Sequence, residues 1–274
     1  MKILLTGGSG FIGGYIAKAL QMAGHELIIA HRGSGIDFNR MLRKEDWLPY
    51  LQDVEVVINS VGIIAETSRQ RFTALHTKAP IALFQACVTT GVKRVIQISA
   101  LGADENAFTP YQVSKKVADD HLRSLPLDWF ILRPSLVYGA GGKSAALFER
   151  MANLPLMIPV VGQGTQLIQP VHITDLVDAV LACLDATSTR RTIDVVGPHV
   201  VCFADWLQKL RLNAGKKRAN IVSIPFKVML AFSYFGHLVI PLLHPDNLRM
   251  LQQGNKADVQ PLSELLGRMP HDLP

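Results

Sequence analysis

The chain has 274 residues, of which 49% are hydrophobic and 18% are charged. This composition excludes general disorder and predicts a packed globular protein, either one large domain or one domain with a smaller lobe. The formal net charge is +6, but the densest basic run, Lys216-Lys217-Arg218, is only three residues long. Such a run is typical of a solvated helix end, so we expect no nucleic-acid binding.

Cysteine and histidine usage argues against disulfides and metals. Cys87, Cys183 and Cys202 are far apart and form no CxxC pair. They predict core thiols in a reducing compartment, and we expect a cytoplasmic protein. The histidines show neither HExxH nor HxxxH spacing, so no metal site is predicted. The N-terminus enters a strand directly and lacks the pattern of a signal peptide.

Short apolar runs alternate with helix-length segments along the first part of the chain. This pattern predicts an α/β fold, a Rossmann doubly wound parallel sheet covered by helices. The predicted strands are 2–6, 26–31, 55–59, 94–99, 129–133 and 192–196. The predicted helices between them are 10–23, 72–90, 110–123 and 173–186.

The alternation weakens after about residue 140, where loops with Gly, Pro and Asn precede helices at 203–213 and 226–240 and a polar tail. We therefore predict an NAD(P)-binding body of residues 1–140 and 169–197. Residues 141–168 and 198–274 would form a smaller, mostly helical substrate-binding lobe. The ending PHDLP has the composition of a linker, which is compatible with a further domain after it.

Within the predicted lobe, residues 226–243 read FKVMLAFSYFGHLVIPLL and are strongly apolar. The segment is barely long enough to span a bilayer, and Lys227, Gly236 and Pro241 interrupt it. We predict a buried or lid-forming helix. The alternative is a helix that lies on a membrane surface or contacts a membrane complex, which would make the protein peripheral to a membrane.

A glycine-rich stretch, TGGSGFIGG, follows the first predicted strand and opens the first helix. Its spacing, T-G-x-x-G-x-x-G, allows a tight turn at Gly7, close approach of a pyrophosphate at Gly10, and close helix packing at Gly13. The phosphates would lie against the free N–H groups and positive end of that helix. The predicted dinucleotide contacts here are Thr6, Gly7, Gly8, Ser9, Gly10, Phe11, Ile12 and Gly13.

The end of the second predicted strand bears on the choice of dinucleotide. NAD sites usually place a carboxylate there for the ribose 2′-hydroxyl. This chain has Ala30-His31-Arg32 and no acidic residue before Asp37. Because an arginine pairs well with a 2′-phosphate, Arg32 favours NADP(H), while NAD(H) stays open as the alternative.

Several motifs now occur together: INSVG at 58–62, YQVSK at 111–115, LRPSLVYG at 132–139 and QPVHITDLVDAV at 169–180. With the glycine-rich stretch, they resemble the extended or atypical branch of the short-chain dehydrogenase/reductase family, which includes NAD-dependent epimerases and dehydratases. GVKRVIQISALGAD and LLHPDNLRML are most similar to the NDUFA-nine-type accessory subunits of respiratory complex I and to NmrA-like proteins. The resemblance implies a Rossmann body with a small lobe over the nicotinamide.

The resemblance also implies a catalytic pair, Tyr111 and Lys115. Residues four apart share one helix face, so an ammonium can lie beside a phenol. A nearby positive charge favours the phenolate and lowers the tyrosine pKa, which suits Tyr111 for general acid or base catalysis. The resemblance further implies that Lys115 binds the nicotinamide ribose.

A catalytic serine is harder to place. Extended members of the family often have three serines at the end of the strand at 94–99 and use the third, and in this chain these positions are Ser99, Ala100 and Leu101. Ser99 lies twelve residues before Tyr111 and either replaces that third serine or helps to bind the nicotinamide. Thr109 is a weaker substitute, and His172 either reaches the substrate cleft or is structural. The resemblance implies additional cofactor contacts from Asn59, Ser60, Val61, Gly62 and Pro134.

These features predict an oxidoreductase that uses NADP(H), or NAD(H), to reduce or oxidise a carbonyl, alcohol or quinone-like apolar small molecule. The alternative is a redox-silent NADPH-binding sensor, assembly factor or respiratory-complex-associated subunit, which the leucine at 101 favours. A sugar-nucleotide epimerase or dehydratase is a third possibility. We disfavour it because the lobe sequence offers no clear cluster of polar and basic residues for a diphosphate.

Overall fold

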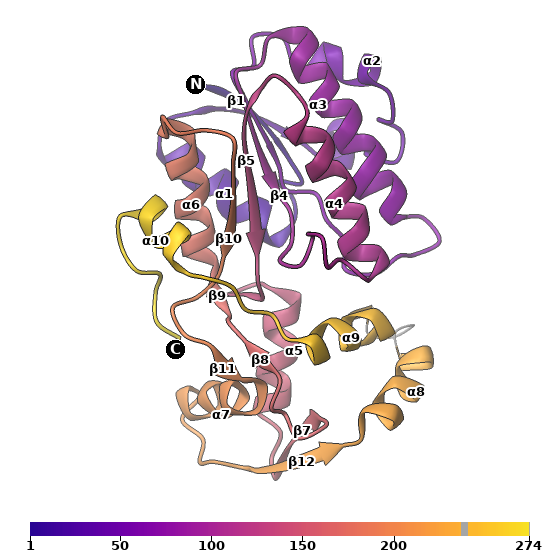
Figure 1. Cartoon of the computed structure of the whole chain (residues 1–274), viewed down its shortest axis with the longest axis vertical. Coiled ribbons are helices and arrows are strands. Elements are labelled where there is room, and N and C mark those ends of the chain that lie inside the picture. Colours follow the sequence, from indigo (N-terminus) through magenta and orange to yellow (C-terminus); the bar gives the residue numbers. More distant parts are fainter. Residues whose placement is uncertain (237–240, 274) are drawn as a thin grey trace.

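Six parallel strands form the central sheet, in the order β2-β1-β3-β4-β5-β10 (Figure 1). A computed structural model of the chain describes residues 1–236 and 241–273, and the side chains of Arg32, Lys143, Phe235 and Pro241 lie outside that description. The strands are β1 (Lys2–Thr6), β2 (Glu26–Ala30), β3 (Val56–Asn59), β4 (Arg94–Ile98), β5 (Asp128–Pro134) and β10 (Arg191–Val195). Each predicted strand is confirmed to within one residue at either end.

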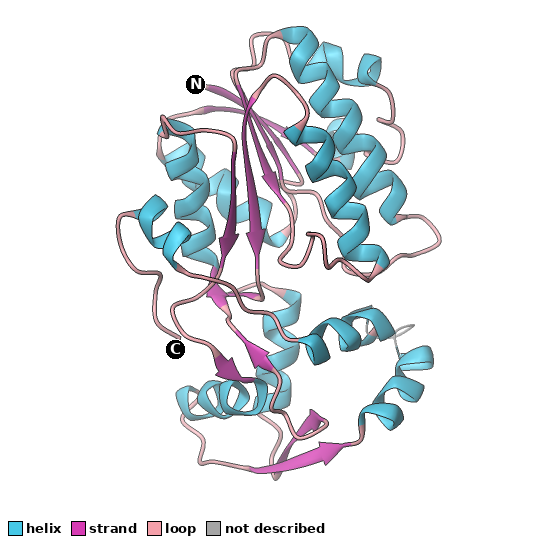
Figure 2. Ribbon diagram, in the orientation of Figure 1, coloured by secondary structure: helices cyan, strands magenta, loops and turns pink. Residues whose placement is uncertain are grey.

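Helices cover both faces of this sheet, as Figure 2 shows. Ile3 and Leu5 of β1 pack with α1 (Phe11–Met22) and α6 (Ile173–Asp185) on one face. Leu4, on the other face, belongs to the core under α3 (Ala79–Thr90) and α4 (Pro110–Arg123). Burial on both faces explains why these strands are nearly continuous runs of Val, Ile and Leu. The fold class predicted from the sequence is confirmed.

The helix predicted at 72–90 is one helical run with two geometries. Its first part, η3 (Thr73–Lys78), is π-helical and continues into α3. Two short elements precede β3 and were not predicted: α2 (Lys44–Trp47) and the 3₁₀ turn η2 (Leu48–Tyr50). A further 3₁₀ turn, η1 (Arg32–Ser34), follows β2.

The lower part of the molecule in Figure 1 is built from α5, α7, α8, α9 and short paired strands. Its elements are β7 (Met157–Val161), β8 (Leu167–Ile168), β11 (Val201–Cys202), β12 (Asn220–Ile224), α5 (Lys143–Ala152), α7 (Phe203–Asn213), α8 (Phe226–Gly236), η4 (Pro241–Leu243) and α9 (Pro245–Gln253). Trp206, Phe203 and Phe148 form its core. β6 (Val137–Tyr138) pairs with β9 (Val171–His172) between this part and the body. We call this part the small lobe.

The predicted polar tail is in fact structured. It contains α9 and α10 (Gln260–Leu266), and Leu262 of α10 is fully buried in the core beneath α6. Arg268 then pairs with Asp175 at 2.8 Å, and the His271 N–H donates to the same carboxylate at 2.9 Å. The predicted division into body and lobe stays a prediction, but α10 packs on the body although the division assigned it to the lobe.

The apolar segment at 226–243 differs from the buried helix that we predicted. Its described helix, α8, ends at Gly236, and residues 237–240 lie outside the described residues. Phe232 is 70% exposed and Tyr234 is 53% exposed, so the outer face of α8 contacts solvent. Among the described helices, none has the length and apolarity needed to cross a bilayer.

Candidate functional site

The strand order brings the predicted site residues to one edge of the sheet. The chain leaves β1 towards β2 on one side and later returns to β3 on the other, so β1 and β3 form a topological switch point. Ligands of open α/β sheets bind outside the carboxyl ends of the strands at such a point. Thr6, Asn59, Ser99 and Pro134 all lie at or just after the carboxyl ends of neighbouring strands.

The glycine-rich turn is held by backbone contacts that a side chain would prevent. A Cβ on Gly13 would lie 2.2 Å from the carbonyl oxygen of Gly7. Gly7 has a φ of +75°, and a Cβ there would lie 2.9 Å from the carbonyl oxygen of Ser60. The N–H of Gly10 donates to the Gly7 carbonyl at 2.9 Å and closes the turn. Helix α1 is thereby pressed against the ends of β1 and β3.

The N-terminus of α1 fits a phosphate group. The helix starts at Phe11, its N-cap Gly10 provides no side-chain hydrogen bond, and its first turn has no acidic residue. The first N–H groups of a helix have no intrahelical partner, and the helix dipole favours an anion beside them. With no side chain on Gly10 to cover these groups, the residues present fit the pyrophosphate of a dinucleotide.

Ser60 and Arg32 are two other predicted cofactor contacts. Ser60 donates its hydroxyl proton to the carbonyl of Thr6 at 2.6 Å, so it fastens β3 to the turn. The Arg32 side chain lies outside the described residues, and only its backbone, in η1, is placed.

Lys115 lies deep at the sheet edge. Its side-chain ammonium donates to the carbonyl of Val61 and to the carbonyl of Ile98, both at 3.0 Å. Lys115 is only 3% exposed, and burial lowers the pKa of its ammonium to about 8, although the charge of Asp119 acts in the opposite direction. The two carbonyls leave the third ammonium hydrogen for a ligand beside Gly62.

Tyr111 lies one helical turn before Lys115 and is partly exposed. Burial, and secondarily the charge of Asp119, raise the pKa of Tyr111 to about 12. In the protein alone, burial therefore outweighs any lowering by Lys115, and the phenol is protonated at neutral pH. Across residues 1–236 and 241–273, no hydrogen bond holds the Tyr111 hydroxyl. Its proton is available to a ligand.

His76, which the sequence analysis did not single out, packs beside Tyr111 with ring centroids 5.5 Å apart. Its Nε2 accepts the Ile63 N–H at 3.0 Å, and its Nδ1 lies 3.0 Å from the Ser114 hydroxyl. Since Ser114 donates its own proton to the Tyr111 carbonyl, Nδ1 must be the protonated nitrogen. Burial holds the pKa of His76 well below its usual value, so the ring is neutral.

A chain of buried polar side chains runs across the sheet edge. Thr6 donates to Asn59 at 2.6 Å, and Asn59 donates to Gln97 at 2.7 Å. Gln97 donates to Asp119 Oδ1 at 3.4 Å, and Ser99 donates to Asp119 Oδ2 at 2.5 Å. All five residues are buried. Asn59 and Thr6, predicted as cofactor contacts, are thus committed to this network through their side chains.

Within this network the Ser99 hydroxyl is a donor to Asp119. Its hydroxyl proton is donated to Asp119, so Ser99 has no proton left for a substrate oxygen while that carboxylate is ionised. Burial raises the pKa of Asp119 to about 6, against the Ser99 hydrogen bond and the charges of Lys115, Arg133 and Arg123.

The other possible donors near the sheet edge are also engaged. Thr109 caps α4 and donates its hydroxyl to Gln112 at 3.0 Å. The Leu101 N–H donates to the carbonyl of Pro134 at 3.0 Å. His172 caps α6, and its Nδ1 forms a hydrogen bond with the Thr174 hydroxyl. These contacts are structural.

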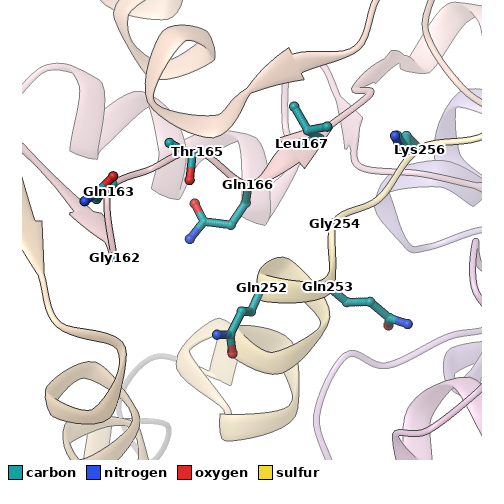
Figure 3. Close-up of a pocket in the computed structure, with 9 residues that line it drawn as sticks. All are labelled: Gly162, Gln163, Thr165, Gln166, Leu167, Gln252, Gln253, Gly254 and Lys256. Atoms are coloured by element: carbon teal, nitrogen blue, oxygen red, sulfur yellow. The ribbon is translucent and has the colours of Figure 1, made fainter.

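A pocket of about 540 Å³ lies in the small lobe between the turn after β7 and the end of α9 (Figure 3). It is lined by Gly162, Gln163, Thr165, Gln166, Leu167, Gln252, Gln253, Gly254 and Lys256. In Figure 3 the Gln166 side chain bends back towards Gly162, and its Nε2 donates to the carbonyl of Val161 at 2.8 Å. Gln252 and Gln253 also line a second hollow of about 360 Å³, which reaches Phe108, three residues before Tyr111. The two hollows therefore share Gln252 and Gln253 of α9.

The sequence of this chain is similar to those of known proteins. The model of the family described as the NAD dependent epimerase/dehydratase family matches residues 3–197. A mitochondrial protein of Arabidopsis thaliana, NADH dehydrogenase [ubiquinone] 1 alpha subcomplex subunit 9, is 26% identical over 83% of this chain and 61% of its own length. A ceramide reductase of Caulobacter vibrioides is 27% identical over 63% of this chain and 57% of its own length. The chain thus spans about three fifths of these relatives.

Among solved structures, the UDP-glucuronic acid 4-epimerase of Bacillus cereus, in complex with UDP-glucuronic acid and NAD, superposes with a TM-score of 0.74. The match covers 99% of this chain and 95% of the epimerase, at 19% sequence identity. This identity is too low to transfer a substrate, and the likeness shows the shared fold.

Gly13→Ala should weaken binding of NADPH and NADH by at least about tenfold, because the new Cβ would displace α1 from the turn that faces the phosphates. Gly14→Ala is the matched control, since its Cβ would meet only the Gly8 carbonyl oxygen at 3.7 Å. Calorimetric titration measures both affinities, with circular dichroism to check folding. Equal affinities in the folded variants would refute the contribution of this contact.

Asp119→Asn should change how stability depends on pH. Because the pKa of Asp119 is raised on folding, its ionisation destabilises the folded protein as pH rises from about 4 to about 6, by up to roughly 3 kcal/mol. Asparagine cannot ionise, and it can donate to Ser99 while accepting from Gln97. Urea unfolding should therefore show the variant gaining stability relative to wild type across this range. A difference that stays constant with pH would contradict the assignment.

Proposed function

This chain belongs to the NAD dependent epimerase/dehydratase family, and we propose that it is an NAD(P)H-dependent oxidoreductase with Tyr111 as its general acid. The observation that carries the proposal is a protonated phenol with no hydrogen-bond partner among the described residues, one helical turn from a buried ammonium group. The favoured reaction is reduction of a carbonyl to an alcohol, and Tyr111 is the base in the reverse direction.

The bound cofactor supplies the hydride that reduces the carbonyl carbon. Tyr111 donates its phenolic proton to the carbonyl oxygen, so the product is a neutral alcohol. The charge of Lys115 then stabilises the phenolate that remains. His76 and Phe72 hold the Tyr111 ring in place from the side. Ser99 is a positioning residue that acts through Asp119. The carboxylate of Asp119 adds a negative charge near both Lys115 and Tyr111.

The pocket lining bears on the substrate. Four glutamine side chains, Thr165 and Lys256 provide hydrogen-bond donors and acceptors, while Leu167 is the one large apolar side chain among the lining residues. We propose a carbonyl compound whose hydrogen-bonding portion occupies this pocket. An apolar or quinone-like portion remains a prediction from the composition of residues 226–243, and it would have to lie elsewhere in the cleft.

A second candidate function is a redox-silent NADPH-binding sensor, assembly factor or respiratory-complex subunit. It is favoured by the engagement of Ser99 with Asp119 and by Leu101 at the usual serine position. The Arabidopsis relative, named as a subunit of NADH dehydrogenase, adds to this candidate. In both cases the cytoplasmic location is a prediction from composition. Cofactor binding without oxidation by any carbonyl or quinone would favour this second function.

Tyr111→Phe should slow hydride transfer by about a hundredfold to ten-thousandfold, because the phenol supplies the proton. Cofactor affinity should change by less than about threefold, since the ring is retained. Stopped-flow absorbance with NADPH and a panel of aldehydes, ketones and quinones measures the rate. Tyr50→Phe, in η2 on the far side of the body, is the control. An unaffected rate in Tyr111→Phe would rule out the proposed acid.

We further propose that the cofactor is NADP(H), bound through the 2′-phosphate by Arg32 at the end of β2. Arg32→Asp should then lower the ratio of NADPH to NADH affinity by at least about tenfold, because a carboxylate repels the phosphate and accepts the 2′-hydroxyl. Arg43→Asp is the control for the change in net charge, because the Arg43 side chain is 80% exposed. An unchanged ratio, measured by titration, would exclude Arg32 from cofactor selection.

A further inference from the structure

Helix α8 exposes apolar side chains where a surface helix usually presents polar ones. Phe226, Met229, Leu230 and Ser233 follow helical spacing and are buried or partly buried. The opposite face carries Val228, 43% exposed, Ala231 and Phe232, 70% exposed. Because water-exposed helices normally carry charged or polar residues on this face, an apolar exposed face marks an interaction surface.

The same surface continues along the chain onto β12. Ile221 and Val222 are both 38% exposed. Figure 1 shows β12 running along the lower edge of the small lobe, with α8 at its end and the connection from α7 at its start. β12 and α8 are therefore consecutive elements at the end of the lobe far from the central sheet, and both carry exposed apolar residues.

Basic residues are concentrated in the same stretch. Between residues 206 and 236 the sequence has six basic residues and no acidic one. Arg211 is buried and donates to the carbonyls of Ala152 and Leu154, so its role is structural. The exposed cations are Lys209, Lys216, Lys217, Arg218 and Lys227. This positive charge is adjacent in the chain to the exposed apolar residues of β12 and α8.

We propose that this edge, Lys216 to Arg218 with β12 and α8, docks on the surface of an anionic lipid bilayer. Exposed cations are attracted to anionic headgroups, and exposed Phe, Tyr, Val and Ile side chains enter the interfacial region. Charge complementarity selects an anionic bilayer as the partner. Residues 206–236 contain no carboxylate, and the bilayer surface carries a fixed negative charge. The residues of this surface do not line either pocket described above.

Docking in this orientation has a consequence for the lobe. Helix α8 contacts α9, and α9 supplies Gln252 and Gln253 to both hollows. The bilayer would therefore bind the lobe one helix away from the proposed substrate pocket. The central sheet would remain at the opposite end of the molecule, in water (Figure 1). The interaction is independent of the proposed reaction, because none of its residues belongs to the catalytic site.

Flotation of the full chain with vesicles tests the proposal. The probes are vesicles of phosphatidylcholine alone and vesicles that also contain phosphatidylglycerol. We expect binding to the anionic vesicles, at least about tenfold weaker binding to the neutral ones, and a further loss as salt is raised. Cofactor binding, measured on the same samples, shows that the protein is folded and separates this test from the proposed reaction.

Two sets of variants separate the contributions. Phe232→Ser should lower the partition coefficient about tenfold or more, because one large apolar side chain no longer enters the interface. Lys217→Glu with Arg218→Glu should abolish the preference for anionic vesicles. Met22→Ser, at an 80% exposed position on α1, is the apolar control. Lys18→Glu with Lys44→Glu, in the body, makes the same change in net charge and should leave binding unchanged.

Three results would overturn the proposal. The first is failure of the wild-type chain to float with anionic vesicles at low salt. The second is equal loss of binding in the body and lobe charge variants, which would reflect net charge alone. The third is a dimer in solution that Phe232→Ser dissociates, which would assign the exposed face of α8 to a second copy of the chain.

Discussion

The candidate site depends on how the buried ammonium group of Lys115 is accommodated. An isolated charge in the interior is strongly unfavourable, so the group must be hydrogen-bonded where it lies. The carbonyls of Val61 and Ile98 accept these hydrogen bonds, and both lie at or just after the carboxyl ends of neighbouring strands. The ammonium therefore ties β3, β4 and α4 together at one point. The position of Tyr111, one turn earlier on α4, follows from that junction.

Much of the body could be predicted because its signals are local. Parallel strands covered on both faces require continuous apolar runs, which are visible in the sequence and define all six strands of the sheet. The glycine spacing reflects a contact between residues six apart, Gly7 and Gly13, so it is also readable. Helix α4 was predicted with its bounds because Thr109 and Pro110 mark its start.

The remaining features depend on residues that are distant in sequence. The role of Ser99 is decided by Asp119, and Gln97 gives no hint in its strand that it links Asp119 to Asn59. His76 reaches Tyr111 from a π-helical turn, which no periodicity signals. Helical spacing reports the charge of Lys115 near Tyr111, but it does not report the burial that raises the Tyr111 pKa in the protein alone. In the small lobe, β7 pairs with β12 across most of the lobe sequence, so neither strand could be recognised alone.

The return of the chain end to the body has a consequence for the order of folding. Leu262 completes the core under α6, and Arg268 neutralises the fully buried carboxylate of Asp175. A nascent chain that has emerged only as far as β10 thus holds an unfilled hydrophobic site and an uncompensated charge. Native packing of the body has to wait until the last helix is synthesised, after the whole lobe. Body and lobe are therefore expected to mature together after translation, and not one after the other during it.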